Sequence, residues 1–181
     1  PQGAMQLLPG RGETVGAALI QDSRVSGVIF TGSTQTANII QKVLANKEGP
    51  IVPLIAETGG MNAMIVDSSA LMEQVVNDAI VSAYGSAGQR CSALRVLFIQ
   101  KDVYPRFKKL LQGAMAELRV GDPKFLTTDV GPVIDDEAQG VLQAHIDEMK
   151  KHHEVIAECQ LDDDVRHGHF VLPIAFEIPN M

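Results

Sequence analysis

Short apolar runs alternate along this chain with longer amphipathic stretches, and this alternation predicts the fold. The runs at 27–30, 51–56, 63–66 and 95–100 have the length of buried strands. Further short runs at 5–8, 170–172 and 175–178 also predict strands. Because strands that alternate with helical patterns are typical of α/β proteins, we expect an α/β fold.

Between these runs, apolar residues recur with the period of an α-helix. Helices are predicted over 14–21, 36–46, 70–86, 103–118 and 137–151. Thr14 and the residues of 67–69 offer N-cap side chains for two of these helices. In the helix over 137–151, the residues expected to face the core are Val141, Leu142, Ile146 and Met149.

The paired glycines at 59–60 separate two α/β patterns. We therefore expect two domains, one over 1–58 and one over 59–181. This boundary would place Glu57 at the seam between them, and small-molecule sites often lie in clefts between domains.

Composition narrows the class of protein. The net charge is −7 and the Lys and Arg residues are scattered, which argues against nucleic acid as the main partner of this segment. No apolar stretch approaches the length of a membrane span. Two cysteines are too few for a disulfide scaffold and fit a reducing, cytoplasmic setting. Because the chain begins at Pro1 and ends like a strand cut short, we expect a fragment of a longer protein.

Two turns carry side chains that suit covalent catalysis. Free cysteines are usually buried and inert, but Cys91 lies among the polar residues of 88–92 (GQRCS). Arg90 would favour the nucleophilic thiolate, and the Cys91 N–H can donate to an oxyanion. Glu57, in 57–60 (ETGG) between two apolar strands, is a candidate general base that could activate a water. The alternatives are an inert cysteine and a helix-capping or salt-bridging glutamate.

A third turn, 30–34 (FTGST), leads from a predicted strand into a predicted helix. Gly32 permits close backbone approach, and Ser33 with the following amides can face a phosphate at the helix N-terminus. An ordinary strand-to-helix turn has the same pattern, and the usual Gly-x-Gly-x-x-Gly fingerprint of dinucleotide binding is absent.

Two other kinds of chemistry are disfavoured. A metal site would combine Cys159 with histidines whose spacing matches no zinc pattern, namely His152, His153, His167 and His169. The acidic run 162–164 lacks the alternating ligands of a calcium loop and suits a solvated turn. A cysteine hydrolase would need a histidine base, and none accompanies the cysteine motif.

Together these motifs resemble the aldehyde dehydrogenase superfamily over essentially the whole chain. The resemblance is carried by 30–34 (FTGST), 57–60 (ETGG), 88–91 (GQRC), 121–123 (GDP), 130–134 (VGPVI) and 168–173 (GHFVLP), and by the 34-residue spacing between Glu57 and Cys91. Thr58 and Met61 stand where most of the superfamily has Leu and Lys. These positions make the chain most similar to Δ1-pyrroline-5-carboxylate dehydrogenases, in particular the dehydrogenase module of bifunctional proline utilization A proteins.

The resemblance implies part of a Rossmann-type cofactor domain followed by most of an α/β catalytic domain. It implies NAD-dependent oxidation of L-glutamate γ-semialdehyde to L-glutamate in proline catabolism, through a thioester. Cys91 would be the nucleophile and Glu57 the general base. The cofactor-binding residues would be Thr31, Gly32, Ser33 and Gly59, and the substrate-binding residues Arg90 and Ser92.

The resemblance also carries expectations about the complete enzyme. FAD would belong to a separate domain of the parent protein, the complete enzyme would be a homo-oligomer, and the isolated chain would be inactive. A choice between NAD and NADP stays open. Two alternatives also stay open, a dehydrogenase for another aldehyde and a non-catalytic structural or interaction module.

Overall fold

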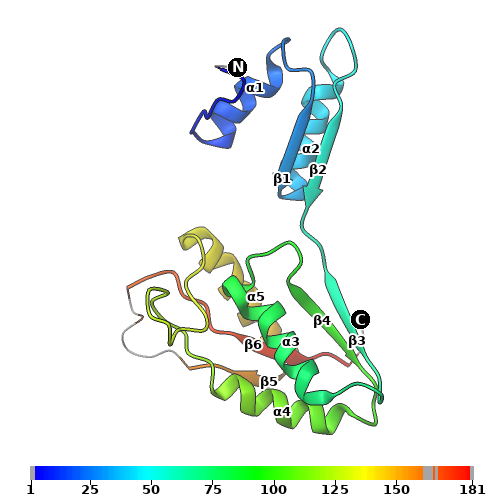
Figure 1. Ribbon diagram of the computed structural model, residues 1–181, viewed down its shortest axis with the longest axis vertical. Helices are drawn as coiled ribbons and strands as arrows, with labels where there is room; N and C mark the ends of the chain where they lie inside the picture. Colours follow the sequence, from blue (N-terminus) through cyan, green and yellow to red (C-terminus); the bar gives the residue numbers. More distant parts are fainter. Residues whose placement is uncertain (1–2, 161–164, 166, 180–181) are drawn as a thin grey trace. The chain divides into compact units, whose positions relative to one another are not determined.

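The computed structural model describes residues 3–160, 165 and 167–179 (Figure 1). The chain divides into two compact units, Pro1–Gly60 and Met61–Met181. Both units contain helices and strands, so the α/β fold class is confirmed. No helix among the described residues is long and apolar enough to cross a membrane.

The first unit is built on a parallel pair of strands joined by a helix. Strand β1 (Val28–Gly32) pairs with β2 (Leu54–Thr58), and α2 (Thr34–Ala45) connects them (Figure 1). The buried residues of α2 are Ala37, Ile40 and Leu44, which recur at helical spacing. Before β1 lie a π-helical turn, η1 (Gly12–Gly16), and the short α1 (Ala17–Gln21).

Two expectations for the start of this unit are wrong. The run 5–8 forms no strand, because Met5 and Leu7 are 94 % and 89 % exposed and no described strand pairs with them. Thr14 caps no helix. The N-cap of η1 is Arg11, and the Thr14 hydroxyl instead donates to the Arg11 carbonyl.

The second unit contains two separate strand pairs. Strands β3 (Asn62–Val66) and β4 (Leu94–Ile99) run parallel, with α3 (Met72–Tyr84) and a short turn of helix, η2 (Gly85–Gly88), between them in the chain. Then follow α4 (Tyr104–Ala116), α5 (Asp136–His152), and the antiparallel pair β5 (Glu154–Glu158) and β6 (Ile174–Glu177).

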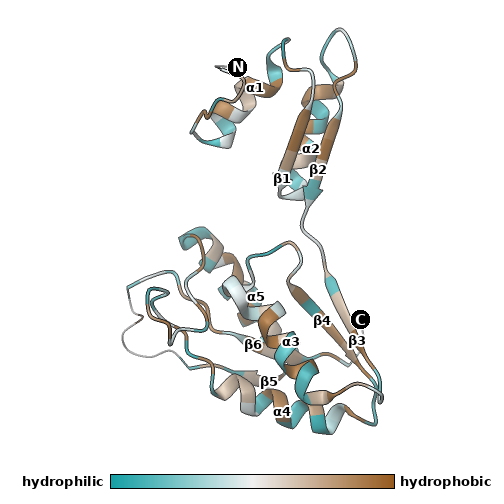
Figure 2. Ribbon diagram, viewed as in Figure 1, coloured by the Kyte–Doolittle hydropathy of each residue, from teal (hydrophilic) through white to brown (hydrophobic). Residues whose placement is uncertain are grey.

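The core of the second unit lies between α3, α4 and the strands. Its buried residues include Val66, Met72, Val76, Phe107, Leu111, Met115 and Cys159. Figure 2 shows apolar residues along β4, beside this core, and also along β1 and β2 in the first unit. Phe107 and Met115 are the largest fully buried side chains, so α4 is the central helix of this core.

Several local expectations for the second unit are also wrong. The N-cap of α3 is Leu71 without a side-chain cap, and Asp67 instead accepts hydrogen bonds from the N–H and hydroxyl of Ser69. The segment 170–172 forms no strand, whereas β5 was not predicted. In α5, Ile146 is buried but Val141 is 66 % exposed and Leu142 37 % exposed, so only part of the predicted apolar stripe meets the core.

Candidate functional site

Cys91 lies in a tight turn that we call the thiol turn, residues 90–93. The Ala93 N–H donates to the Arg90 carbonyl at 3.1 Å, so Cys91 and Ser92 are the two central residues of a hydrogen-bonded β-turn. Both central side chains are exposed, whereas Ala93 is fully buried. The turn is therefore anchored at one end and presents a free thiol at its centre.

The chain reaches the thiol turn through an unusual left-handed segment. After α3 ends at Tyr84, Ser86, Ala87 and Gly88 have φ of 57°, 52° and 69°. A non-glycine residue in this region costs about 1–2 kcal/mol, because its Cβ approaches a carbonyl oxygen. Such strain is found where surrounding contacts over-determine the backbone, often at functional sites.

Gln89 supplies several of those contacts. Its Nε2 donates to the carbonyls of Ser86 and Pro132 at 3.1 and 3.3 Å, and its Oε1 accepts the Ile134 N–H at 2.8 Å. The side chain thus joins the left-handed segment to the loop that carries the 130–134 motif. That motif and the cysteine motif, more than forty residues apart in sequence, belong to one local structure.

Arg90 binds the carboxyl end of α3. Its Nη2 donates to the carbonyls of Val81 and Ser82 at 2.7 and 3.3 Å. The last carbonyls of a helix lack intrahelical partners and carry partial negative charge, so a guanidinium is favourable there. A substrate contact by Arg90 stays a prediction, as does one by Ser92. In this structure the Arg90 guanidinium holds the thiol turn against the end of α3.

Two residues of the β3–β4 pair contact this region: Asn62 holds the thiol turn, and Arg95 holds the left-handed segment before it. Asn62 Nδ2 donates to the carbonyls of Cys91 and Ala93, and Arg95 Nη2 donates to the Gly88 carbonyl at 2.6 Å. Neither residue stands out in the sequence. Both were missed because their role depends on strand pairing, which no local pattern specifies.

The other predicted residues gather in the first unit, at the carboxyl ends of β1 and β2. The parallel register sets Thr31 opposite Glu57 and Gly32 opposite Thr58. Ser33 is the N-cap of α2, and its Oγ accepts the Thr36 N–H at 3.1 Å. Carboxyl ends of parallel strands and helix N-termini are where α/β proteins commonly bind anionic ligands.

The Phe30 ring packs so closely against position 32 that glycine fits there best. A Cβ there would lie 2.5 Å from Cζ of the Phe30 ring, so a larger residue would displace that ring.

Gly59 follows β2 and is exposed, and a Cβ there would meet nothing within 4 Å. Glu57 is exposed on β2. Glu57 and Gly59 belong to the first unit, whereas Cys91 belongs to the second.

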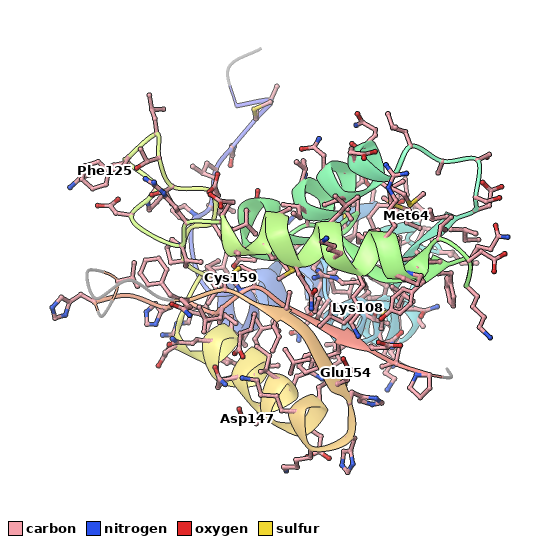
Figure 3. All side chains as sticks on the ribbon, turned by 90° about the horizontal axis from the view of Figure 1, so that it is seen from below. Met64, Lys108, Phe125, Asp147, Glu154 and Cys159 are labelled. Carbon is pink, nitrogen blue, oxygen red and sulfur yellow. The ribbon has the colours of Figure 1, made fainter. Side chains whose placement is uncertain are left out.

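Cys159 has a structural environment that contrasts with that of Cys91. It is 3 % exposed, and its Sγ donates to the Met115 carbonyl of α4 at 3.3 Å (Figure 3). Burial, with a smaller contribution from nearby Glu158, raises the pKa of the Cys159 thiol to about 11. Among the described residues no three His, Cys, Asp or Glu side chains are grouped to hold a metal, and the acidic run 162–164 lies outside those residues.

A charged cluster joins α4 to the β5–β6 pair. Lys108 Nζ lies 2.7 Å from Glu154 Oε1 and 2.9 Å from Glu177 Oε2, and the Tyr104 hydroxyl donates to Glu177 (Figure 3). Hydrogen bonds from Tyr104 and then Lys108 hold the pKa of Glu177 below its usual value. The carboxylates in turn raise the pKa of Lys108. This cluster connects α4 to the β5–β6 pair. None of its ion pairs and hydrogen bonds involves a residue of the thiol turn.

Comparisons with known proteins agree with these motifs. The model of the aldehyde dehydrogenase family matches residues 1–180. The chain is 54 % identical to the bifunctional protein PutA of Salmonella typhimurium, over 99 % of the chain and 14 % of that protein. It therefore spans only a small part of the length of this curated relative.

Two solved structures extend the similarity to the fold. A crystal structure of a mutant of proline utilization A (PutA) from Bradyrhizobium japonicum matches with a TM-score of 0.93 and 49 % identity, covering 99 % of this chain and 18 % of that one. The 1-pyrroline-5-carboxylate dehydrogenase from Thermus, with bound NAD, matches with a TM-score of 0.85 and 30 % identity, covering 93 % and 33 %.

Proposed function

The chain belongs to the aldehyde dehydrogenase family, and we propose that the protein containing it oxidises L-glutamate γ-semialdehyde to L-glutamate with NAD. The observation that carries this proposal is the exposed thiol of Cys91 at the centre of the thiol turn. The side chains of Asn62 and Arg90 hold this turn, and those of Gln89 and Arg95 hold the left-handed segment before it. The names of the relatives, PutA and 1-pyrroline-5-carboxylate dehydrogenase, support the choice of substrate.

In the proposed reaction, the Cys91 thiolate attacks the aldehyde carbon. A C–S bond forms and the carbonyl electron pair moves onto oxygen, where the Cys91 N–H can donate to it. When bound, NAD would accept the hydride lost from this carbon. The electron pair on oxygen then re-forms the C=O bond, which leaves the substrate as a thioester on Cys91. Glu57 then takes a proton from water as the water attacks the thioester carbon. The C–S bond breaks, which releases glutamate and restores the thiolate.

The residues at the end of the β1–β2 pair fit an anionic dinucleotide. The N-terminus of α2 carries backbone N–H groups that suit a phosphate, and the turn of Thr31, Gly32 and Ser33 leads directly into it. Gly59 follows the neighbouring strand. We therefore propose that residues 1–58 belong to the cofactor domain, that 59–181 belong to the catalytic domain, and that NAD rests on this turn.

The test is a kinetic comparison in the full-length protein. With L-glutamate γ-semialdehyde and NAD, Cys91→Ala should abolish NADH formation, whereas Cys159→Ala should retain it in the folded protein. Glu57→Gln should give a burst of about one NADH per site and then stall, because the thioester forms but is not hydrolysed. Full turnover by Cys91→Ala would refute the proposal.

The same assay separates the alternatives. Turnover of other aldehydes in preference to the semialdehyde would identify a different dehydrogenase, and no turnover at all would favour a non-catalytic module. We expect the 181-residue chain alone to form no NADH, since it spans 14 % of the length of the Salmonella relative. A homo-oligomeric enzyme, a cytoplasmic location and FAD elsewhere in the protein stay predictions.

A further inference from the structure

Asn62 makes a side-chain contact to the backbone of Cys91 itself. It is the first residue of β3 and is half-buried, and its Nδ2 donates to the Cys91 carbonyl at 2.7 Å and to the Ala93 carbonyl at 2.9 Å. Both partners are carbonyl oxygens, which only accept hydrogen bonds. The amide nitrogen of Asn62, with two N–H donors, must therefore face them.

An irregularity in the strand pairing brings Asn62 to this place. Asn62 pairs with Leu94, but the next residue, Ala63, pairs with Val96, so Arg95 is the extra residue of a β-bulge. Bulges occur beside active sites, where they redirect a side chain. Here the bulge residue reaches back to the Gly88 carbonyl at 2.6 Å, while Asn62 lies level with the end of the thiol turn.

The bond to Asn62 completes the fixation of the Cys91 backbone. The peptide plane before Cys91 is held through the Arg90 carbonyl, which accepts from Ala93 N–H. The plane after it is held through the Cys91 carbonyl, which accepts from Asn62. Because each peptide is planar, holding both carbonyls fixes φ and ψ of Cys91. Rotation about χ1 is then the remaining freedom of Sγ.

The same two planes carry donors beside the thiol. In a trans peptide the N–H points opposite to the carbonyl, so the held carbonyls also orient the N–H groups of Cys91 and Ser92. Neither N–H donates to an acceptor among the described residues. These donors suit negative charge that develops on a substrate oxygen.

We propose that Asn62 is a positioning residue for the aldehyde oxidation, which orients the Cys91 thiol and the adjacent N–H groups by holding the Cys91 carbonyl. The inference rests on the proposed function of Cys91 as nucleophile. It assigns to Asn62 no contact with substrate or cofactor. Its effect should therefore appear in the chemical step and not in cofactor binding.

The experiment compares three variants of the full-length protein. Asn62→Asp is isosteric but presents only acceptors to the two carbonyls, and Asn62→Ala removes the contact. Gln100→Ala is the matched control, because Gln100 Oε1 accepts the Ser68 N–H at 2.8 Å beyond the opposite end of the same strand pair. The measurements are kcat, KM for NAD, the rate of the first turnover, and the fraction of folded protein.

Both Asn62 variants should lower kcat and the first-turnover rate by roughly 10- to 100-fold, the scale of a small misplacement of a reacting group. KM for NAD should stay within about two-fold, and Gln100→Ala should keep the wild-type kcat per folded molecule. Wild-type kcat in Asn62→Asp would overturn the inference. The inference would also be overturned if Asn62→Ala and Gln100→Ala lost kcat equally and in proportion to their loss of folded protein.

A second measurement keeps this test independent of the substrate. If the wild-type protein forms no NADH from any aldehyde, the proposed function fails, and the rate of Cys91 alkylation by iodoacetamide then tests Asn62. The neutral variant Asn62→Ala should react at a rate several-fold different from that of Gln100→Ala, because loss of the bond to the Cys91 carbonyl releases the backbone that orients Sγ. Equal rates in the two variants would overturn the positioning role.

Discussion

Replacing Gly88 by alanine tests whether the left-handed segment before the thiol turn exists and matters. Gly88 is buried, with φ of +69°. A Cβ there would lie 2.8 Å from the Ala83 carbonyl oxygen, a backbone atom that cannot rotate away. It would also lie 3.1 Å from Nη1 of Arg95, whose Nη2 donates to the Gly88 carbonyl.

The magnitude follows from three effects. The left-handed conformation costs alanine about 1–2 kcal/mol. Displacement of the Arg95 guanidinium would weaken a charge-assisted hydrogen bond worth about 1.5–3 kcal/mol. Against these, alanine restricts the unfolded chain and so stabilises the fold by about 0.4–1 kcal/mol. We expect a net destabilisation of about 2–4 kcal/mol, to which the close approach of the Ala83 oxygen contributes further.

Urea unfolding of the 181-residue chain, followed by circular dichroism, measures this effect. The midpoint should fall by about 1–2 M in Gly88→Ala. Gly113→Ala is the matched control, because Gly113 lies inside α4 and a Cβ there meets nothing within 4 Å. That variant should be more stable by about 0.5–1 kcal/mol. If Gly88→Ala were as stable as Gly113→Ala, the left-handed conformation assigned to this segment would be wrong.

Two further predictions concern titration. Burial raises the pKa of the Cys159 thiol to about 11 and keeps it from solvent, whereas Cys91 is exposed, so iodoacetamide should modify Cys91 in the folded protein and Cys159 only after unfolding. Peptide mass mapping checks this, and comparable labelling of both cysteines before unfolding would contradict it. The second prediction is a loss of stability in acid. Tyr104 and Lys108 depress the pKa of Glu177, so the stability it contributes is complete above the usual value of 4.5 and is lost as pH falls through the lower folded-state pKa. Thermal unfolding from pH 7 to 3 should show a shallower acid loss in Glu177→Gln, and identical slopes would refute the assignment.

Much of the local structure follows from the sequence because it depends on neighbours in the chain. The apolar run around Phe30 and the helical stripe of α2 predict a strand and a helix that both form. The polar neighbours of Cys91 predict an exposed thiol, and Cys91 is exposed. Both inferences use only residues within one or two helical turns, the range over which periodicity reports burial.

Other local predictions failed where a distant strand or a competing nearby donor decides the outcome. The run 5–8 has the composition of a strand but has no partner among the described strands, whereas β5 forms because β6 pairs with it. Asp67 has the chemistry of an N-cap but binds Ser69 instead. A strand needs another strand to satisfy its N–H and C=O groups, and a capping side chain can choose between nearby donors.

By itself, the sequence determined the α/β class, the order of most elements and the exposed thiol of Cys91. Only the tertiary structure decided how that thiol is held. It placed the Arg90 guanidinium on α3 and the amide of Asn62 on the Cys91 carbonyl. The physical reason is that periodicity records which side of an element is buried, whereas a hydrogen bond between residues 29 positions apart depends on the register in which two strands pair.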